Sequence, residues 1–217
     1  MGGCFNKPNP HYGEVTLDYL KNNAQTGDII LVSGESFFSK LIKFVTDTPW
    51  THVGVIVVLN GHRFVFQSLN SSNEVLEDYL ENKLISEGVQ LNDLEGTILA
   101  DMDKIYYRKL IRPDNVNEIA FFNRSNAFMK KERTKLYEKD LIELANSVLG
   151  NNRYRNTSTY FCSELVAEWF FYTGYATETD PFFPSSNYTP DSFSDTPNRE
   201  FKLNPPYKFG QIMKIVC

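Results

Sequence analysis

The first half of the chain alternates between apolar runs and short turn segments. Residues 29–32 (Ile-Ile-Leu-Val) are β-branched at three of four positions and predict a strand. Apolar residues then recur at helical spacing over residues 37–45, which predicts a helix with one apolar stripe. Two β-rich runs, residues 52–59 and 63–68, flank Asn60-Gly61, a pair typical of two-residue hairpin turns. We therefore expect a strand, a helix and a β-hairpin in that order.

The second half carries longer helical patterns. Leucines recur on one face of residues 130–149, which predicts a long helix, and a second helix is predicted over residues 159–172. Shorter patterns predict a helix at 74–82, a strand at 104–111 and an edge strand at 210–216. Strands and helices of this kind together predict an α+β fold.

We expect one folded domain over residues 27–217, preceded by an N-terminal arm over residues 1–26 that is rich in Gly, Pro and Asn at its start. No internal repeat interrupts the domain. The segment 175–208 contains six prolines, which indicates a long ordered loop rather than a second domain. Its aromatic residues are candidates for contact with a partner or for a lid: Tyr175, Phe182, Phe183, Tyr188 and Phe193.

The composition excludes several classes of protein. The 22 basic and 27 acidic residues give a net charge of −5, which argues against nucleic acid as a partner. Three cysteines without a CxxC pair and three scattered histidines predict neither a disulfide scaffold nor a metal site, and no cofactor motif is found. No signal peptide or membrane-spanning run is found, so we expect a cytoplasmic protein.

The chain opens Met-Gly-Gly-Cys, which suggests a lipid anchor. Gly2 would accept a myristoyl chain and Cys4 a palmitoyl chain, the second signal that stable membrane binding requires. Asn6 departs from the Ser or Thr that the myristoylation motif prefers. The alternative is that this start has no such role. With the anchor, the protein would associate with a membrane surface.

Cys162 is the candidate nucleophile. It falls in the first turn of the helix predicted over 159–172, where the helix dipole stabilises a thiolate. The alternative is a buried cysteine that acts as a small apolar residue, as free cysteines often do. Position along the chain does not decide between the two.

His52 and Gln67 are candidates for the residues that would act with this thiol. With a two-residue turn at Asn60-Gly61, opposed residue numbers sum to 121, so Gly54 faces Gln67. His52 and Gln67 would then share one face as diagonal neighbours, roughly 7–8 Å apart at Cα. A three-residue loop would instead separate them onto opposite faces. An imidazole beside Cys162 would lower the thiol pKa, and a third polar group would orient the ring.

Three segments resemble the permuted papain-like amidase family of the YaeF/YiiX type, within the NlpC-type thiol hydrolase superfamily. They are Gly27-Asp-Ile-Ile-Leu31, Pro49-Trp-Thr-His-Val-Gly-Val55 and Tyr160-Phe-Cys-Ser-Glu-Leu-Val166. They occur with the histidine before the cysteine, the order that a circular permutation of a papain-like chain produces. The resemblance spans about residues 27–172.

The resemblance implies a circularly permuted papain-like fold, with an antiparallel sheet packed against helices. It implies Cys162 as nucleophile, His52 as general base and Gln67 as the third polar residue, where relatives usually have Glu. Asp28 and Glu164 match the motifs as supporting or pocket groups. The implied function is a thiol hydrolase or acyltransferase that forms an acyl-thioenzyme on an amide, ester or thioester of a peptide or lipid.

Two alternatives stay open. One is a lipid-anchored binding or interaction module that keeps this fold with weak or no activity, which the neutral Gln67 would favour. The other is a cysteine endopeptidase that cleaves unmodified peptides.

Overall fold

The computed structural model describes residues 12–35, 37–69, 76–100, 104–113, 118–140, 146–152, 158–178, 183–195 and 197–216. Its centre is a seven-stranded sheet in the order β1-β11-β8-β2-β3-β4-β7. The strands are β1 (Gly13–Thr16), β2 (Ile29–Val32), β3 (His52–Leu59), β4 (His62–Leu69), β7 (Gly88–Asp93), β8 (Ile105–Ile111) and β11 (Lys208–Val216). Neighbours pair antiparallel except β1 and β11, which run parallel.

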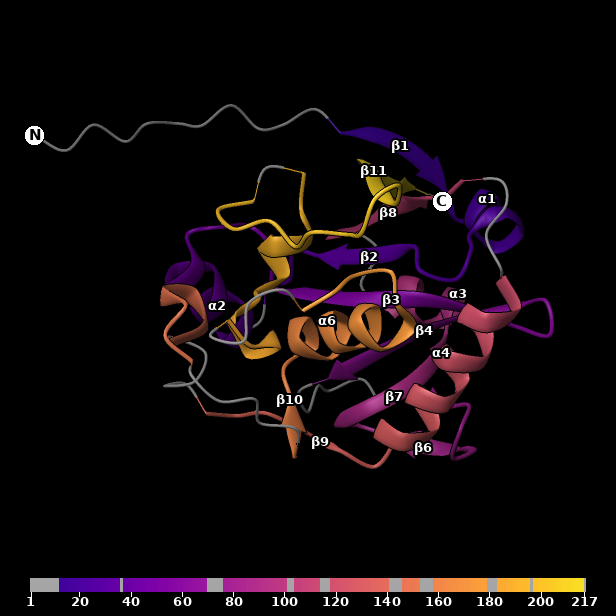
Figure 1. Ribbon diagram of the computed structural model, residues 1–217, viewed down its shortest axis with the longest axis horizontal. Helices are drawn as coiled ribbons and strands as arrows, with labels where there is room; N and C mark the ends of the chain where they lie inside the picture. Colours follow the sequence, from indigo (N-terminus) through magenta and orange to yellow (C-terminus); the bar gives the residue numbers. More distant parts are fainter. Residues whose placement is uncertain are drawn as a thin grey trace, which may run out of the picture.

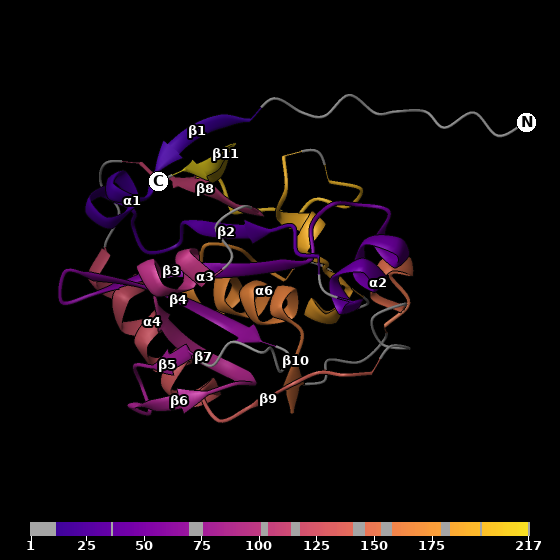
Figure 2. The same cartoon turned by 180° about the vertical axis from the view of Figure 1, so that it is seen from behind.

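Helices cover both faces of this sheet. The helix α6 (Cys162–Thr173) lies along one face with α4 (Glu118–Glu132) beside it (Figure 1). The helices α1 (Leu17–Asn23) and α3 (Leu94–Ala100) lie on the other face (Figure 2). The helix α2 (Phe37–Thr46) connects β2 to β3. The arrangement is the α+β class with a mostly antiparallel sheet that the sequence predicts.

Alternating residues of β3 divide the core into two clusters. Val53, Val55 and Val57 pack with Leu165 and the other buried residues of α6. Ile56 faces the opposite way and packs with residues of α1 and α3. This alternation follows from the period of two in a strand, and it gives each face of β3 a different neighbour.

The hairpin forms with the predicted register. Pairs run from Leu59–His62 to Val55–Phe66, and each pair sums to 121. Asn60 and Gly61 both have positive φ, 51° and 84°, as a two-residue turn of this hand requires. The predictions of β2, β8 and the helix over 37–45 are also confirmed.

The long helix predicted over residues 130–149 is wrong over residues 133–140, whereas residues 130–132 end a helix and residues 146–149 are helical. The helix α4 ends at Glu132, and residues 136–137 form the short strand β9 (Leu136–Tyr137), paired parallel with β10 (Thr159–Tyr160). Tyr137 is buried against Phe161 and Ile42, and Leu136 is 61% exposed. Tertiary pairing with a distant strand therefore overrides the local helical pattern. Residues 141–145 lie outside the described residues.

The helix predicted at 74–82 is wrong over its described part. Residues 76–85 form a hairpin of β5 (Leu76–Asp78) and β6 (Lys83–Ile85). The buried carboxylate of Asp78 accepts the backbone N–H groups of Glu81 at 2.9 Å and Leu91 at 2.6 Å. A side chain that bonds the backbone of a turn and of β7 stabilises the hairpin in place of a helical turn.

The ends of the chain also differ from the predictions. β11 is an inner strand, because β1 pairs with its outer side. Within the segment 1–26 that was expected to be an arm, residues 13–23 form β1 and α1, and Leu20 is fully buried. Residues 1–11, with Gly2 and Cys4, lie outside the described residues, so the lipid anchor stays a prediction. Within the described chain, no helix is long and apolar enough to cross a bilayer.

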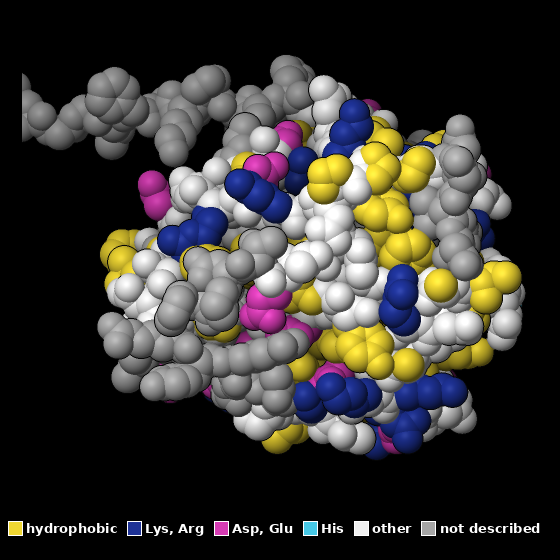
Figure 3. Space-filling model, viewed as in Figure 1, with side chains coloured by type: hydrophobic (Ala, Val, Ile, Leu, Met, Phe, Trp, Pro, Cys, Tyr) yellow, Lys and Arg dark blue, Asp and Glu magenta, His cyan; other side chains and the backbone are white. Residues whose placement is uncertain are grey.

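The segment after α6 wraps the molecule as an ordered loop with two 3-10 turns, η2 (Ser185–Asn187) and η3 (Pro190–Phe193). Tyr175 and Phe193 are fully buried there and contact Phe170 of α6. These two rings belong to the core and cannot serve a partner or a lid, which corrects that expectation. On the face seen in Figure 3, apolar side chains form separate patches with Lys and Arg between them.

Candidate active site

Cys162 is the first residue of α6. The preceding residues Thr159 and Tyr160 pair with β9 in extended conformation, and Phe161 is the N-cap at φ −67° and ψ 155°. The helix therefore begins three residues later than the sequence predicts, directly at the candidate nucleophile. Cys162 is buried, and Ser163 and Glu164 of the first turn are buried with it.

The thiol lies beside the start of β3, near the end of the register that β3 shares with β4. Their paired register ends at Val55–Phe66; beyond it, residues 52–54 pair with β2 and residues 67–69 pair with β7. The backbone N–H groups of Val53, Ser163 and Cys162 lie close enough to the sulfur of Cys162 to oppose the rise in its pKa. The hydroxyl of Ser68 on β4 donates to the carbonyl of Tyr160 at 2.9 Å. The start of α6 is thus held near the end of this shared register.

His52 and Gln67 are hydrogen-bonded just beyond the end of the register that β3 shares with β4. The distance from Nε2 of His52 to Oε1 of Gln67 is 2.8 Å. A Cβ at Gly54, between them, would lie 2.6 Å from Cγ1 of Val65 and 3.4 Å from Cβ of Gln67. The glycine therefore provides the space for the pair, as the register predicts.

His52 adjoins Val53, whose N–H contacts the thiol, but its side chain leaves β3 on the opposite face. Cys162 packs with Val53 on the α6 side of the sheet. The hydrogen bond of His52 goes to Gln67, and the sulfur of Cys162 lies beside backbone N–H groups, so these interactions do not join the two side chains directly.

Burial keeps both groups uncharged. It raises the pKa of the Cys162 thiol to about 11, although the three backbone N–H groups favour the thiolate. It lowers the pKa of His52 to about 4, against the opposing effect of Gln67. The lowered thiol pKa expected from an imidazole neighbour is thus not found: the resting pair is a neutral thiol and a neutral imidazole.

A chain of buried amides continues from Gln67, and sequence reasoning missed it. Nε2 of Gln67 donates to Oδ1 of Asn92 at 2.9 Å. Nδ2 of Asn92 donates to the backbone carbonyl of Glu77 at 3.1 Å and to Oε1 of Gln90 at 2.9 Å. The signal was available: residues 89–92 (Val-Gln-Leu-Asn) alternate apolar and polar as a strand does, which places both amides on one face.

Two further residues near or within the motifs have defined places. Tyr137, which the sequence analysis assigned to a helix, lies close enough to Cys162 that charge on the sulfur contributes to a raised pKa of its hydroxyl, after burial. Glu164 is buried in the first turn of α6.

Asp28 has a structural role away from the thiol. Its carboxylate accepts the hydroxyl of Tyr107 at 2.6 Å and the backbone N–H groups of Leu110 and Gln25, each at 2.8 Å. Burial raises its pKa, and these hydrogen bonds oppose the rise. It joins the start of β2 to β8, and its backbone carbonyl accepts the N–H of Ile56 in the middle of β3.

No family model matches the chain, and no curated protein matches it. Among solved structures, it is similar to the crystal structure described as metalloprotein yiiX from Escherichia coli O157:H7, at 18% identity and a TM-score of 0.49. The match covers 86% of this chain and 96% of that chain. In the described part of the present chain, no group of three or more His, Cys, Asp or Glu side chains is placed to hold a metal ion.

Proposed function

We propose that this chain is a cysteine-nucleophile hydrolase or acyltransferase with a circularly permuted papain-like, NlpC-type fold. Cys162 is the nucleophile, His52 the general base and Gln67 the group that orients the imidazole. One observation carries the proposal: a thiol at the first residue of a helix lies beside Val53, the residue that follows a histidine held by a buried amide.

The neutral pair determines the order of proton transfer. With Nε2 of His52 donating to Gln67, Nδ1 carries the lone pair and accepts the thiol proton as the sulfur attacks the substrate carbonyl. The imidazolium then protonates the leaving amine, alcohol or thiol, and the acyl group stays on Cys162 as a thioester. Water or another acceptor attacks this thioester, losing its proton to Nδ1, and the thiol is regenerated with that proton.

Acyl transfer also requires stabilisation of an oxyanion, and we assign this role to the backbone N–H groups near the sulfur. An attacked carbonyl becomes an oxyanion, and backbone N–H groups placed near its oxygen stabilise it without reorganisation. Those of Cys162 and Ser163 lie at the N-terminus of α6, where the helix dipole adds to the effect. Gln67 orients the imidazolium without neutralising it, which predicts a slower enzyme than one with Glu at this position.

Mass spectrometry of the acyl-enzyme tests the proposal. The intact protein is incubated with p-nitrophenyl butyrate, a fatty acyl thioester and an unmodified peptide, and then acid-quenched. We expect an adduct of the acyl mass on Cys162 with the ester or thioester, and none in Cys162→Ala. No adduct with any substrate, in protein shown to be folded, would overturn the proposal and favour a binding module. Turnover of the unmodified peptide alone would favour the endopeptidase.

A matched pair of histidine variants separates catalysis from general damage. His52→Ala removes the proposed base, and His62→Ala removes an exposed histidine from the other strand of the same hairpin. The adduct should form much more slowly in the first variant only.

A further inference from the structure

We propose that Asn92 is a positioning residue that decides which nitrogen of His52 carries the proton. It does so by fixing which amide atom of Gln67, Oε1 or Nε2, faces His52. The importance of this for catalysis rests on the proposed function, but the proton position itself can be measured without any substrate.

The direction of the amide chain is set by a backbone carbonyl. The carbonyl of Glu77 can only accept, so Asn92 must turn its NH₂ toward it. Oδ1 of Asn92 then faces Gln67 and can only accept, so Gln67 presents its NH₂ to Asn92 and its Oε1 to His52. An acceptor at Nε2 requires the proton there, and Nδ1 keeps the lone pair.

A second carbonyl enforces the same direction. Oε1 of Gln90 also accepts from Asn92, and Nε2 of Gln90 donates to the carbonyl of Gly88 at 3.4 Å. Gln67, Gln90 and Asn92 are each 1% exposed or less. Reversing the direction of these amide hydrogen bonds would therefore place one donor opposite another at buried positions, where no water can compensate.

The side chain of residue 67 must be held in one orientation because it is a glutamine. A carboxylate at position 67 would accept in either orientation, but an amide has a wrong one. With the amide reversed, its NH₂ would donate to Nε2 of His52, the proton would move to Nδ1, and the base would be blocked. Asn92 excludes that state.

Long-range ¹H–¹⁵N NMR of the histidine ring above pH 8 tests the inference. Wild type should show His52 protonated on Nε2. In Asn92→Leu the anchor is lost, and a substantial share of Nδ1-protonated ring should appear. Asn92→Asp keeps an acceptor toward Gln67 and should retain the wild-type tautomer. A wild-type tautomer in the folded Leu variant would overturn the inference.

A double variant distinguishes positioning from a merely structural role. In Gln67→Glu the tautomer no longer depends on the amide direction, so adding Asn92→Leu should leave Nε2 protonated. A shift to Nδ1 in that background would overturn the inference. If these tautomers are found and no acyl-enzyme forms, the proposed function fails while the role of Asn92 stands.

A different observation carries a second inference, independent of catalysis. We infer that a cavity at the other end of β3 binds a carboxylate with an apolar or aromatic body. It has a volume of about 420 Å³, within the usual range of ligand pockets. Val58 in its lining lies six residues from His52, roughly 20 Å at about 3.3 Å per residue.

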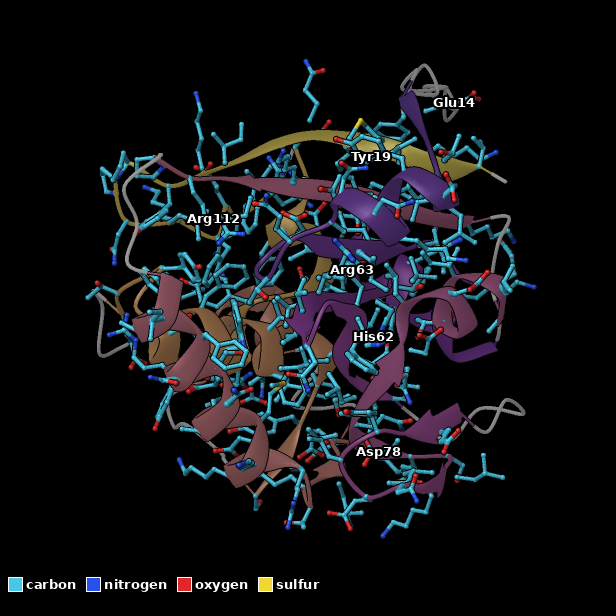
Figure 4. The ribbon with its side chains drawn as sticks, turned by 90° about the vertical axis from the view of Figure 1, so that its right-hand side faces the viewer. Glu14, Tyr19, His62, Arg63, Asp78 and Arg112 are labelled. Atoms are coloured by element: carbon cyan, nitrogen blue, oxygen red, sulfur yellow. The ribbon has the colours of Figure 1, made fainter. Side chains whose placement is uncertain are left out.

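The lining combines two cations with aromatic rings. Arg63 and Arg112 both line it, and Figure 4 shows them on the same side of the molecule. Phe121 and Tyr175 stack at 4.2 Å between centroids, and Phe122 adds a partly exposed ring. None of the described lining residues is acidic, although the Asp28 carboxylate lies close enough to Arg112 for the two charges to interact.

Arg63 has capacity left for a ligand. Its Nε, Nη1 and Nη2 donate to the backbone carbonyls of Ala24, Gly61 and Asn22, which uses three of about five N–H groups. Among the described residues these partners are all uncharged, so the guanidinium meets no carboxylate of the protein. Arg112 contributes bonds to Gln25 and Tyr175. A carboxylate fits this fork, and the partly exposed ring of Phe122 fits its apolar body.

Calorimetry with the Cys162→Ala protein tests this site without turnover. Decanoate should bind at least tenfold more tightly than 1-decanol or decylammonium, and decyl phosphate tells whether the head must be a carboxylate. Phe122→Glu places a like charge at a partly exposed position and should weaken decanoate binding at least tenfold, whereas Arg133→Met, outside the cavity, should not. Equal binding of the alcohol, tighter phosphate binding or an unaffected Glu variant would overturn the inference.

Discussion

Two buried polar clusters lie beside β3, one level with Ile56 and the other at His52, and they differ in which hydrogen-bonding atoms they leave available. At one, the Asp28 carboxylate accepts three hydrogen bonds from β8 and the segment before β2. At the other, the His52–Gln67 pair ends in a ring nitrogen that no protein group occupies among the described residues. A saturated cluster stabilises the fold, and an unsaturated one can do chemistry. Both clusters are buried, so it is the unoccupied ring nitrogen, and not burial, that distinguishes the group proposed to act in catalysis from the structural one.

The largest expected effect is on catalysis at the unsaturated cluster. His52→Ala should lower the rate of acyl-enzyme formation about a thousandfold, because the neutral thiol loses its proton acceptor. His62→Ala should leave the rate within twofold. Stopped-flow measurement of p-nitrophenol release checks both, and equal rates for the two variants would contradict the role of His52.

The thiol itself should behave as a weak nucleophile in the free protein. Because its pKa is raised to about 11, the neutral form dominates at pH 7, with about one thiolate in ten thousand molecules. As pH rises the thiol ionises, so the rate of iodoacetamide alkylation should increase about tenfold per pH unit up to near pH 10. Cys4 and Cys217 are replaced by Ser for this measurement. Fast alkylation below pH 7 that depends on His52 would show an ion pair instead.

The saturated cluster should respond in stability rather than in chemistry. Asp28→Ala leaves three donors without their acceptor and should lower the free energy of unfolding by about 3–5 kcal/mol. Urea denaturation measures the loss, and Asp18→Ala, an exposed acid on α1, is the control. The acyl-enzyme rate per folded molecule should stay unchanged. A large fall in that rate would erase the distinction between the clusters.

The smallest expected effect tests the space between His52 and Gln67. Gly54→Ala introduces a Cβ 2.6 Å from Cγ1 of Val65 and should cost about 1–3 kcal/mol of stability. It should also slow acyl-enzyme formation, because Gln67 is displaced from the imidazole. Gly96→Ala, in α3 with only one ordinary contact at 3.8 Å, is the matched control. Equal stability of the two variants would show that a Cβ at position 54 fits without displacing its neighbours.

The parts of the fold that were predictable are those where short-range chemistry and tertiary structure agree. Asn60-Gly61 forces a two-residue turn, and that turn alone determines the register that brings His52 to Gln67. The end of α6 at Gly174 follows equally from the left-handed conformation it adopts, at φ 90°. Residues 133–140 fail for the opposite reason, since Tyr137 is buried by a partner from another part of the chain.

The sequence by itself determined β2, β3, β4, β8 and the hairpin register, because these depend on neighbours a few residues apart. Only the tertiary structure decided the pKa directions, since burial outweighs a helix terminus once α6 covers the sheet. It also decided that Asn92 continues the amide chain, because β7 joins β4 through pairing that no local pattern encodes. The features that the sequence determined depend on residues close together along the chain, and those that the tertiary structure decided depend on residues far apart along it.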